Sequence, residues 1–355
     1  MSTRPFEISV IVCTHNPRRD FLERTLEGLK RQTVPSDQWE LLIIDNASMP
    51  AVGEVADISW HSGARIVRED QLGLTAARLR GIKEITADLL VFVDDDNVLC
   101  RDYLEQAVAI HQRLPMLGVF GPASIAPEYE ESPKADLLPY VNMLALREST
   151  EPHWSNDPTD RHAPWGAGMV LVRCVAEQVV AGLEADGRKL SLGRCGTSLN
   201  SCEDDEFAWI ASAMGMGNGI FPELKITHLI PRGRVQREYL LRIKEGHEYS
   251  RTMLWFFHDR PRHVSPPPVN GMDLLKSALL LRSRSFLKQA VRFARQMTWS
   301  KTEKAFIEAG YRGISRALQD IEALSSDSNA SPVDPSPTGL RKSLAAAHKA
   351  AEANR

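Results

Sequence analysis

Three consecutive aspartates, Asp94, Asp95 and Asp96, follow the apolar run LLVFV and have the residue type and spacing of a cation site. Carboxylate oxygens suit Mg²⁺ and Mn²⁺, which are often bound by one or two carboxylates together with substrate phosphates. A lone D-x-D is also typical of a solvated acidic turn. Here, however, a buried strand ends abruptly in three acids, which repel one another unless a cation is present. The triplet therefore predicts a divalent-cation site that includes Asp94 and Asp96.

A second group of carboxylates lies in CEDDEFAWIASAMG, residues 202–215, which reads as a helix that opens with acids. Negative side chains are favoured at the N-terminal end of a helix by the helix dipole. That structural role is the preferred interpretation for Asp205 and Glu206. Asp204 is the favoured candidate for proton transfer, with Glu203 and Asp205 as alternatives, because a positioned carboxylate can accept a proton from an attacking hydroxyl.

The elements that must position these acids alternate between strand and helix over the first 125 residues. The runs ISVIVC, WELLIID and LLVFVDDDN predict strands, and residues 19–32 and 74–84 predict helices with apolar side chains on one face. Unbroken apolar strands that alternate with helices indicate a mostly parallel sheet covered by helices on both faces. Residues 165–173 and 219–231 predict later strands, and residues 126–163 predict a partly helical excursion over the site.

Polar residues follow three of these strands: Thr14-His15-Asn16, Asp45-Asn46 and Asp94-Asp95-Asp96. In open α/β sheets, ligands bind beyond the carboxyl ends of the strands. We therefore expect all three clusters to meet at one rim of the sheet.

Composition supports a globular protein with an uneven charge distribution. The 355 residues are 43% hydrophobic with a formal net charge of −3, but residues 260–316 carry +9 and residues 1–259 carry −11. Five cysteines without a C-x-x-C pair suit free thiols in a reducing cytoplasm, which is the expected location. No apolar run approaches the length of a signal-peptide core or a membrane span.

We predict three regions along the chain. Residues 1–232 form the catalytic domain, residues 233–324 a helical and basic C-terminal region, and residues 325–355 a tail. The tail opens with SSDSNASPVDPSPT, whose low complexity cannot repay the entropy cost of ordering.

Six motifs in order give the chain a family resemblance: SVIVCTHN, IIDNAS, GLTAARLRGI, FVDDDN, WGAGMVLVR and CEDDEF. Together they resemble the inverting family 2 glycosyltransferases of the GT-A fold and cover about residues 7–230. The resemblance implies a Rossmann-like central sheet with a C-terminal helical extension. It also implies a metal-dependent enzyme that moves a sugar from a nucleotide-sugar donor, with a UDP-sugar favoured, to a hydroxyl of a glycan or lipid-linked acceptor in polysaccharide, glycolipid or other surface-glycan synthesis.

The resemblance also implies roles for individual residues. Asp45 matches the aspartate that accepts a hydrogen bond from the uracil N3–H, and Asp204 matches the general base. His228 falls where many GT-A enzymes contact the metal or diphosphate. Asp94 and Asp96 match the pair that contacts Mn²⁺ or Mg²⁺ and the ribose. The other residues assigned to the donor are Thr14, His15, Asn16, Gly73, Arg78 and Asp95.

Trp165, Gly166 and Glu203 are assigned to the acceptor side. The glycines of WGAG are equally typical of a tight turn, whereas the functional interpretation has the sugar stack on Trp165 beside exposed backbone. His247, alone on a predicted helix, is interpreted as a surface or core residue.

The basic segment permits two interpretations. If residues 275–297 are helical, apolar side chains line one face and Arg284, Lys288, Arg292 and Arg295 the other. Such a helix either packs on the catalytic domain or lies peripherally on the anionic inner face of a membrane. Nucleic-acid binding is not expected, because the body is acidic and no recognisable module is present.

Two other functions stay open from the sequence. A nucleotidyltransferase shares a similar sheet and acidic metal site, but it would need a glycine-rich loop after the first strand, and CTHNPRRD contains no glycine. A catalytically degenerate glycan-binding protein would not need Asp94, Asp96 and Asp204 together.

Overall fold

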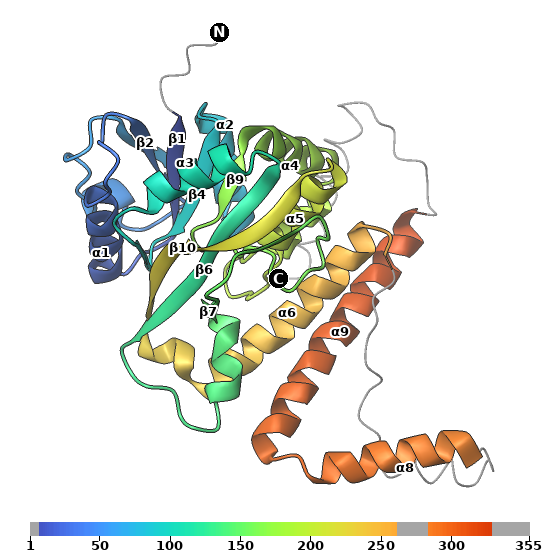
Figure 1. The fold of residues 1–355 in the computed structure, drawn as a ribbon. Coiled ribbons are helices and arrows are strands. Elements are labelled where there is room, and N and C mark those ends of the chain that lie inside the picture. Colours follow the sequence, from blue (N-terminus) through green and yellow to red (C-terminus); the bar gives the residue numbers. More distant parts are fainter. Residues whose placement is uncertain (1–6, 261–282, 329–355) are drawn as a thin grey trace.

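The computed structural model describes residues 7–260 and 283–328 (Figure 1). Its strands are β1 (Ile8–Thr14), β2 (Trp39–Asp45), β3 (Ala64–Arg68), β4 (Leu89–Asp94), β5 (Asn97–Leu99), β6 (Leu117–Tyr129), β7 (Arg147–Glu148), β8 (His153–Ser155), β9 (Val170–Val172) and β10 (Gly217–Ile230). They form one sheet in the order β3-β2-β1-β4-β9-β6-β10-β5, with β7 paired to β6 and β8 to β10.

The first half of the sheet is parallel, as predicted. β1 pairs with β2 and β4, and β2 pairs with β3, all in parallel. The register places Thr14 opposite Asp45, and Cys13 opposite Asp94. The carboxyl ends of β1, β2 and β4 therefore lie at one rim, which is the arrangement the three polar clusters predict.

The second half of the sheet is mixed. β9 is antiparallel to both β4 and β6, whereas β10 runs parallel to β6 and antiparallel to β5. The strand predicted over residues 165–173 is thus limited to Val170–Val172, because the preceding glycine-containing segment turns at the rim. This antiparallel insertion brings Trp165 and Gly166 to the site.

Helices cover both faces of the sheet (Figure 1). The α/β body contains α1 (Arg19–Lys30), α2 (Leu74–Glu84), α3 (Tyr103–Arg113), α4 (Arg173–Ala185) and α5 (Glu203–Ala213). Apolar faces of α1 and α3 pack with Val10, Val12 and their neighbours on one side of the sheet. α2, α4 and α5 pack with Ile11 and neighbouring residues on the other side. The period-two alternation of β1 thus supplies two separate cores.

Short helical turns connect these elements: η1 (Val52–Glu54), η2 (Leu138–Leu144), η3 (Gly187–Leu192) and η4 (Arg232–Val235). η2 lies in the predicted excursion. A third apolar cluster joins η2 and the end of β10 to the C-terminal helices, through side chains that include Leu144, Ile230 and Phe306.

The C-terminal region consists of α6 (Arg237–Phe257), α8 (Ser283–Met297) and α9 (Lys301–Ser328). α6 and α9 lie side by side (Figure 1). Phe306 of α9 stacks on Tyr140 at 3.6 Å between ring centroids, and the Tyr249 hydroxyl donates to Asp320 at 2.7 Å. α9 therefore fixes α6 against the body, and the helical extension predicted after residue 232 is present.

Parts of the C-terminal predictions lie outside the described residues, namely 275–282 of the expected basic helix and 329–355 of the expected tail. α9 continues to Ser328, beyond the predicted start of the tail at residue 325. None of the helices in the described part of the chain is long and apolar enough to cross a bilayer.

Candidate active site

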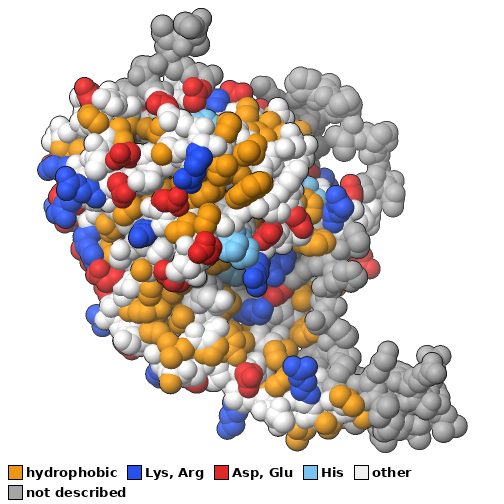
Figure 2. Space-filling view, viewed as in Figure 1, with side chains coloured by type: hydrophobic (Ala, Val, Ile, Leu, Met, Phe, Trp, Pro, Cys, Tyr) orange, Lys and Arg blue, Asp and Glu red, His pale blue; other side chains and the backbone are white. Residues whose placement is uncertain are grey.

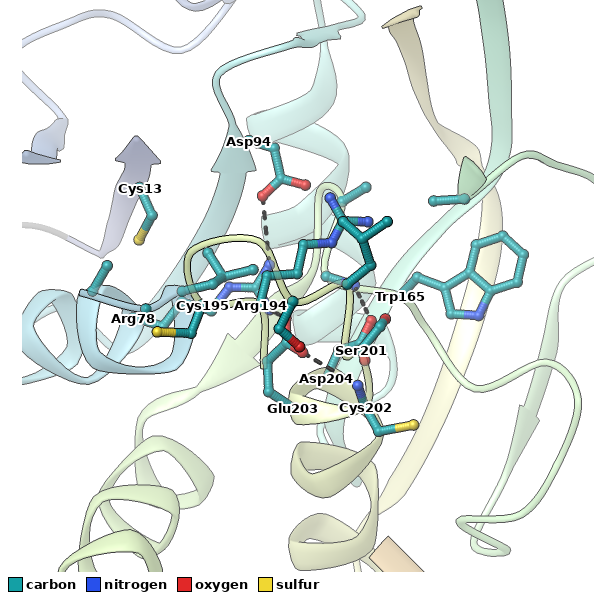
Figure 3. Close-up of a pocket in the computed structure, with 18 of the residues that line it drawn as sticks. Cys13, Arg78, Asp94, Trp165, Arg194, Cys195, Ser201, Cys202, Glu203 and Asp204 are labelled. Atoms are coloured by element: carbon teal, nitrogen blue, oxygen red, sulfur yellow. Dashed lines mark hydrogen bonds and ion pairs between the residues drawn. The ribbon is translucent and has the colours of Figure 1, made fainter. Parts of the chain in front are cut away.

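A cavity of about 580 Å³ opens at the carboxyl rim of the sheet. Its walls come from the ends of β1 and β4, the start of α2, the loop before β9, the start of α5, and α6. Most of the predicted site residues line this cavity: Thr14, His15, Gly73, Arg78, Asp94, Asp95, Asp96, Trp165, Gly166, Glu203, Asp204 and His228. Figure 3 shows several of them. Asp45 and Asn16 are not among the lining residues.

The aspartate triplet concentrates negative charge in the cavity. Asp96 is buried and accepts a hydrogen bond from Arg234 at 2.6 Å, and His228 Nε2 lies 3.6 Å from the same carboxylate. Although burial opposes ionisation, these two partners hold the pKa of Asp96 well below its usual range. Asp95 accepts from Thr14 Oγ1. Burial, followed by the charges of Asp96 and Asp94, raises the pKa of Asp95 to about 7.

Arg78 ties the triplet to the second carboxylate group. Its side chain is only 2% exposed, and its guanidinium lies 3.0 Å from Glu203 and 3.5 Å from Asp94. A Cβ on Gly166 would lie 2.3 Å from Arg78 Nη2, so glycine at that position is required by the arginine. Burial and then the neighbouring Asp204 raise the pKa of Glu203 to about 7, against the opposing charge of Arg78. Glu203 is therefore the partner of Arg78 in a buried ion pair.

Asp204 is held at the start of α5 with both carboxylate oxygens oriented. Oδ2 accepts from Gly166 N–H at 2.8 Å, and Oδ1 accepts from Asp205 N–H at 2.9 Å (Figure 3). Asp205 also lines the cavity, and burial together with the charge of Asp204 raises its pKa to about 6. Glu206 points elsewhere: it is buried and bonded to Lys189 and His258, each at 2.6 Å. Glu206 thus has the structural role that its place at the helix start predicts.

His15 and Asn46 line the part of the cavity wall that lies at the ends of the first two strands. His15 Nδ1 lies 2.6 Å from the Asn46 carbonyl, so it donates there, and Nε2 then accepts from Asn16 Nδ2 at 3.0 Å. The Asn46 side chain accepts from Gly73 N–H at 2.9 Å. Gly73 has φ +136°, which favours glycine. The ring of His15 is exposed at the cavity edge.

Asp45 and Asn16 organise this wall from behind. Asp45 is buried and accepts from the N–H groups of Ser48 and Val52 at 2.8 and 3.1 Å. Burial opposes its ionisation, but these hydrogen bonds and Arg68 lower its pKa overall. Asn16 Oδ1 accepts from Met49 N–H at 2.8 Å. In this structure both residues hold loops together, and the nucleobase contact predicted for Asp45 stays a prediction.

Trp165 forms the opposite wall. The guanidinium carbon of Arg147 lies 3.8 Å from the centroid of its ring, and Arg147 also donates to the Ala163 carbonyl at 2.9 Å. This cation–π contact fixes one face of the indole. The WGAG segment therefore has a structural role and a place in the cavity. Gly166 leaves room for Arg78, and Trp165 is part of the cavity wall.

The structure adds cavity residues that sequence reasoning missed. They are Tyr239, His247 and Arg251 of α6, Asn142–Ala145 around the end of η2, and the arginines Arg194 and Arg234. His247, interpreted from the sequence as a surface or core residue, lines the cavity. One signal was available: His247 and Arg251 are four residues apart, so a helix places them on the same face.

Comparison with known proteins agrees with this architecture. Residues 9–152 match the model of the glycosyl transferase family 2. Glycosyltransferase AglE of Haloferax volcanii is 30% identical over 111 residues, which are 30% of this chain and 36% of that protein. The putative glycosyltransferase EpsH of Bacillus subtilis is 27% identical over 101 residues, 28% of each chain. The matches thus span about a third of these relatives' length.

A solved structure extends the likeness to the whole fold. The mannosyltransferase PcManGT from Pyrobaculum calidifontis, in complex with GDP-Man and Mn²⁺, has a TM-score of 0.54 and 17% identity, covering 90% of this chain and 88% of that one. Residues 9–152 therefore match glycosyl transferase family 2, and the chain has the GT-A fold with C-terminal helices. The family resemblance and the fold class predicted from the sequence are confirmed.

The residues of the cavity fit a divalent cation by their chemistry. Asp94 and Asp96 offer hard oxygen ligands, and the clustered charge around Asp95 is what a cation would relieve. His228 Nδ1 is buried without a hydrogen-bond partner among the described residues. Within 7–260 and 283–328, no group of three or more His, Cys, Asp or Glu residues is placed so that it could hold a metal ion by itself. Two carboxylates suffice when substrate phosphates supply the remaining ligands.

Proposed function

We propose that this protein is an inverting glycosyltransferase that moves a sugar from a nucleoside-diphosphate sugar to a hydroxyl of its acceptor. The observation that carries the proposal is the placement of Asp204. Its carboxylate lies in the same cavity as Asp94 and Asp96, and its two oxygens are oriented by backbone N–H groups. One site thus contains a carboxylate suited to accept a proton and others suited to a diphosphate-bound cation.

The chain's own residues would divide the work in the following way. His15 and Asn46 contact the nucleoside, and Asp94 and Asp96 hold Mn²⁺ or Mg²⁺, which neutralises the diphosphate when bound. Trp165 offers a flat surface to the acceptor. Asp204 takes the proton of the acceptor hydroxyl as its oxygen attacks the anomeric carbon, while the bond from that carbon to the diphosphate breaks and the nucleoside diphosphate leaves. That single displacement inverts the anomeric configuration and needs no covalent nucleophile.

The direct test is turnover of a donor panel. The full chain is incubated with Mn²⁺ or Mg²⁺ and UDP-, GDP- and TDP-sugars, and release of the nucleoside diphosphate is measured together with product mass. The family resemblance favours a uridine donor, whereas PcManGT was solved with GDP-Man. Release that depends on the cation supports the proposal. Transfer of a nucleotidyl group would instead indicate a nucleotidyltransferase, and glycan binding without turnover a degenerate transferase.

Asp96→Asn tests the cation site. We expect cation-dependent binding of the nucleoside diphosphate to fall at least about tenfold, because the amide removes a charged ligand while preserving side-chain volume. Isothermal titration calorimetry with and without Mn²⁺ measures the effect. Glu69→Asn is the control, since Glu69 is an acid outside the cavity wall. Unchanged Mn²⁺ dependence in Asp96→Asn would remove Asp96 from the cation site.

The described part of the basic helix considered for membrane contact is α8. Figure 1 shows this helix projecting from the start of α9, away from the sheet. Its sequence contains four basic residues and no acid, while Val291 and Met297 are 61% and 66% exposed. Figure 2 shows acidic and basic side chains interspersed over the α/β body. On the face seen in this view, the described residues of the body therefore form no large basic patch that would be an alternative membrane-binding surface. We propose that α8 lies on an anionic membrane surface.

Replacing Val291 and Met297 by Asp tests this contact. We expect binding to phosphatidylglycerol-containing liposomes to fall about tenfold or more, because each aspartate removes buried apolar area and adds like charge. Flotation of liposomes measures the effect. Leu318→Asp is the control, since Leu318 is an exposed apolar residue on α9. If the α8 variant floats like the unmodified protein, α8 does not make the contact.

A further inference from the structure

Two arginines of the cavity wall, Arg194 and Arg251, have guanidinium groups without a direct hydrogen bond or ion pair in the described part of the chain. Arg194 lies on the loop after η3 and Arg251 on α6, and both line the cavity. No hydrogen bond or ion pair to either guanidinium occurs within residues 7–260 and 283–328. Arg78 and Arg234, by contrast, are each ion-paired to carboxylates of the cavity. Arg194 and Arg251 are therefore available to an anionic ligand.

The position of Arg251 separates it from the cation site. Its charge acts on Asp205, Cys202 and His247, which surround the start of α5. The charge of Arg234 instead acts to lower the pKa values of Asp95 and Asp96, and the charge of Arg194 also acts to lower that of Asp96. Arg251 thus lies on the Asp204 side of the cavity, while Arg194 lies between the two sides. Figure 3 shows Arg194 extending into the space between Asp94 and Trp165.

The backbone holds these residues firmly. α6 and the loop around Leu199 approach so closely that a Cβ on Gly246 would lie 2.3 Å from the Leu199 carbonyl oxygen. Ser201 N–H also donates to Ser250 Oγ at 3.0 Å. His247 follows Gly246 and lies one helical turn from Arg251. Burial, and then Arg194 and Arg251, lower the pKa of His247 to about 4, so it is neutral at pH 7 and can donate a hydrogen bond without adding charge.

We propose that Arg194 and Arg251, together with His247, bind a phosphate group of the acceptor and so present the acceptor hydroxyl to Asp204. The inference rests on the proposed function for the meaning of "acceptor", but the anion site itself does not. Each guanidinium is a planar fork of N–H donors that suits the oxygens of a phosphate, and Arg251 is exposed to a ligand in the cavity. A neutral sugar would offer neither guanidinium an anionic partner. The substrate class is therefore a phosphorylated hydroxyl compound, either a soluble sugar or polyol phosphate or the phosphate of a lipid headgroup.

The experiment uses the full chain with GDP or UDP and Mg²⁺ at saturation, so that the donor diphosphate site is filled. Glycerol 3-phosphate, glycerol and inorganic phosphate are then titrated by calorimetry. We expect both phosphates to bind and glycerol not to bind, and Arg251→Gln and Arg194→Gln each to weaken phosphate binding at least tenfold. Arg101→Gln is the matched control, because Arg101 is exposed and lies outside the cavity wall. Melting temperatures establish that each variant is folded.

A second measurement separates ligand binding from charge balance within the protein. A phosphate bound beside His247 should raise the pKa of its imidazole, which NMR titration of the ring detects. If the two arginines only neutralise Glu203 and Asp205, phosphate will leave that pKa unchanged and the proposal fails. It also fails if saturating nucleotide abolishes phosphate binding, because the arginines would then serve the donor diphosphate.

Two further outcomes identify the ligand and isolate the inference. Vesicles of phosphatidic acid that bind in an Arg251-dependent manner, when glycerol 3-phosphate does not, would assign the phosphate to a lipid headgroup. The opposite pattern would assign it to a soluble acceptor. If phosphate binds as expected but no nucleotide sugar is turned over, the proposed function fails while the anion site stands. Turnover without phosphate binding leaves the transferase proposal intact and overturns this one.

Discussion

Asp204→Asn should lower kcat for sugar transfer by about 10²- to 10⁴-fold, the range expected for loss of a general base. The amide keeps the size of the side chain, and its oxygen can still accept from Gly166 N–H, which lies 2.8 Å from Oδ2 in the unmodified protein. The variant loses the ability to take a proton from the acceptor hydroxyl, together with the hydrogen bond that Oδ1 accepts from Asp205 N–H. Binding of the nucleoside diphosphate should stay within about threefold of the unmodified protein, since the proposed donor contacts lie at the aspartate triplet.

Asp205→Asn is the matched control for Asp204→Asn. It removes an adjacent carboxylate that also lines the cavity, so a general loss of negative charge would affect both variants equally. We expect Asp205→Asn to retain transfer within a few-fold. Steady-state kinetics and donor calorimetry are measured on both proteins. Near-normal transfer by Asp204→Asn, or a larger loss in Asp205→Asn, would show that the base has been assigned to the wrong residue.

The second large effect concerns stability. Arg78→Met should lower the free energy of unfolding by about 3–5 kcal/mol, because removing one partner of a buried ion pair leaves the other charge uncompensated. Arg78 is buried between Glu203 and Asp94, at 3.0 and 3.5 Å. Methionine has a similar length and no charge, so the effect is mainly electrostatic. Chemical denaturation monitored by circular dichroism measures the loss.

The loss in Arg78→Met should depend on pH in a defined direction. Burial and Asp204 already raise the pKa of Glu203 to about 7, and removing Arg78 raises this pKa further. An acid whose pKa is raised in the folded protein binds protons more readily than in the unfolded chain, so stability falls as pH rises from about 4 through the folded value. The variant should therefore lose more at pH 8 than at pH 6.

Arg78→Met combined with Glu203→Gln provides the control for this mechanism. The double variant has no charge at either position, so it should recover part of the stability and lose most of the pH dependence. An equal loss at pH 6 and pH 8 would mean that Arg78 acts through packing, for instance against Phe92, whose ring centroid lies 5.3 Å from its guanidinium carbon.

Local patterns were enough to predict the rim of the sheet where the cavity opens, but not the opposite wall of that cavity. Apolar runs that end in Thr14, Asp45 and Asp94 define parallel strands, and parallel strands bring their carboxyl ends together. The helix over residues 74–84 was predicted with the observed bounds. The reach of Arg78 to Glu203, 125 residues along the chain, is set by tertiary packing that periodicity does not contain.

The α6 wall was harder to foresee for a physical reason. His247 and Arg251 enter the cavity because α9 and the loop around Leu199 hold α6 against the body, and none of these contacts is local in sequence. Asp45 shows the converse case. Its type and position were read correctly as a strand end, but its oxygens are directed at Ser48 and Val52 by the turn that follows.

The way α9 packs along α6 has a consequence for protein engineering. The matched family segment ends at residue 152, which invites shortening the chain or exchanging its later part as an independent module. Yet the cavity wall on α6 is supported from behind by Phe306 and Ala317 of α9. A chimera joined anywhere between residues 153 and 300 would separate the residues of the cavity at the sheet rim from α9, which supports the α6 wall. Transplanting this cavity wall into another protein therefore requires η2, α6 and α9 to be moved as a unit.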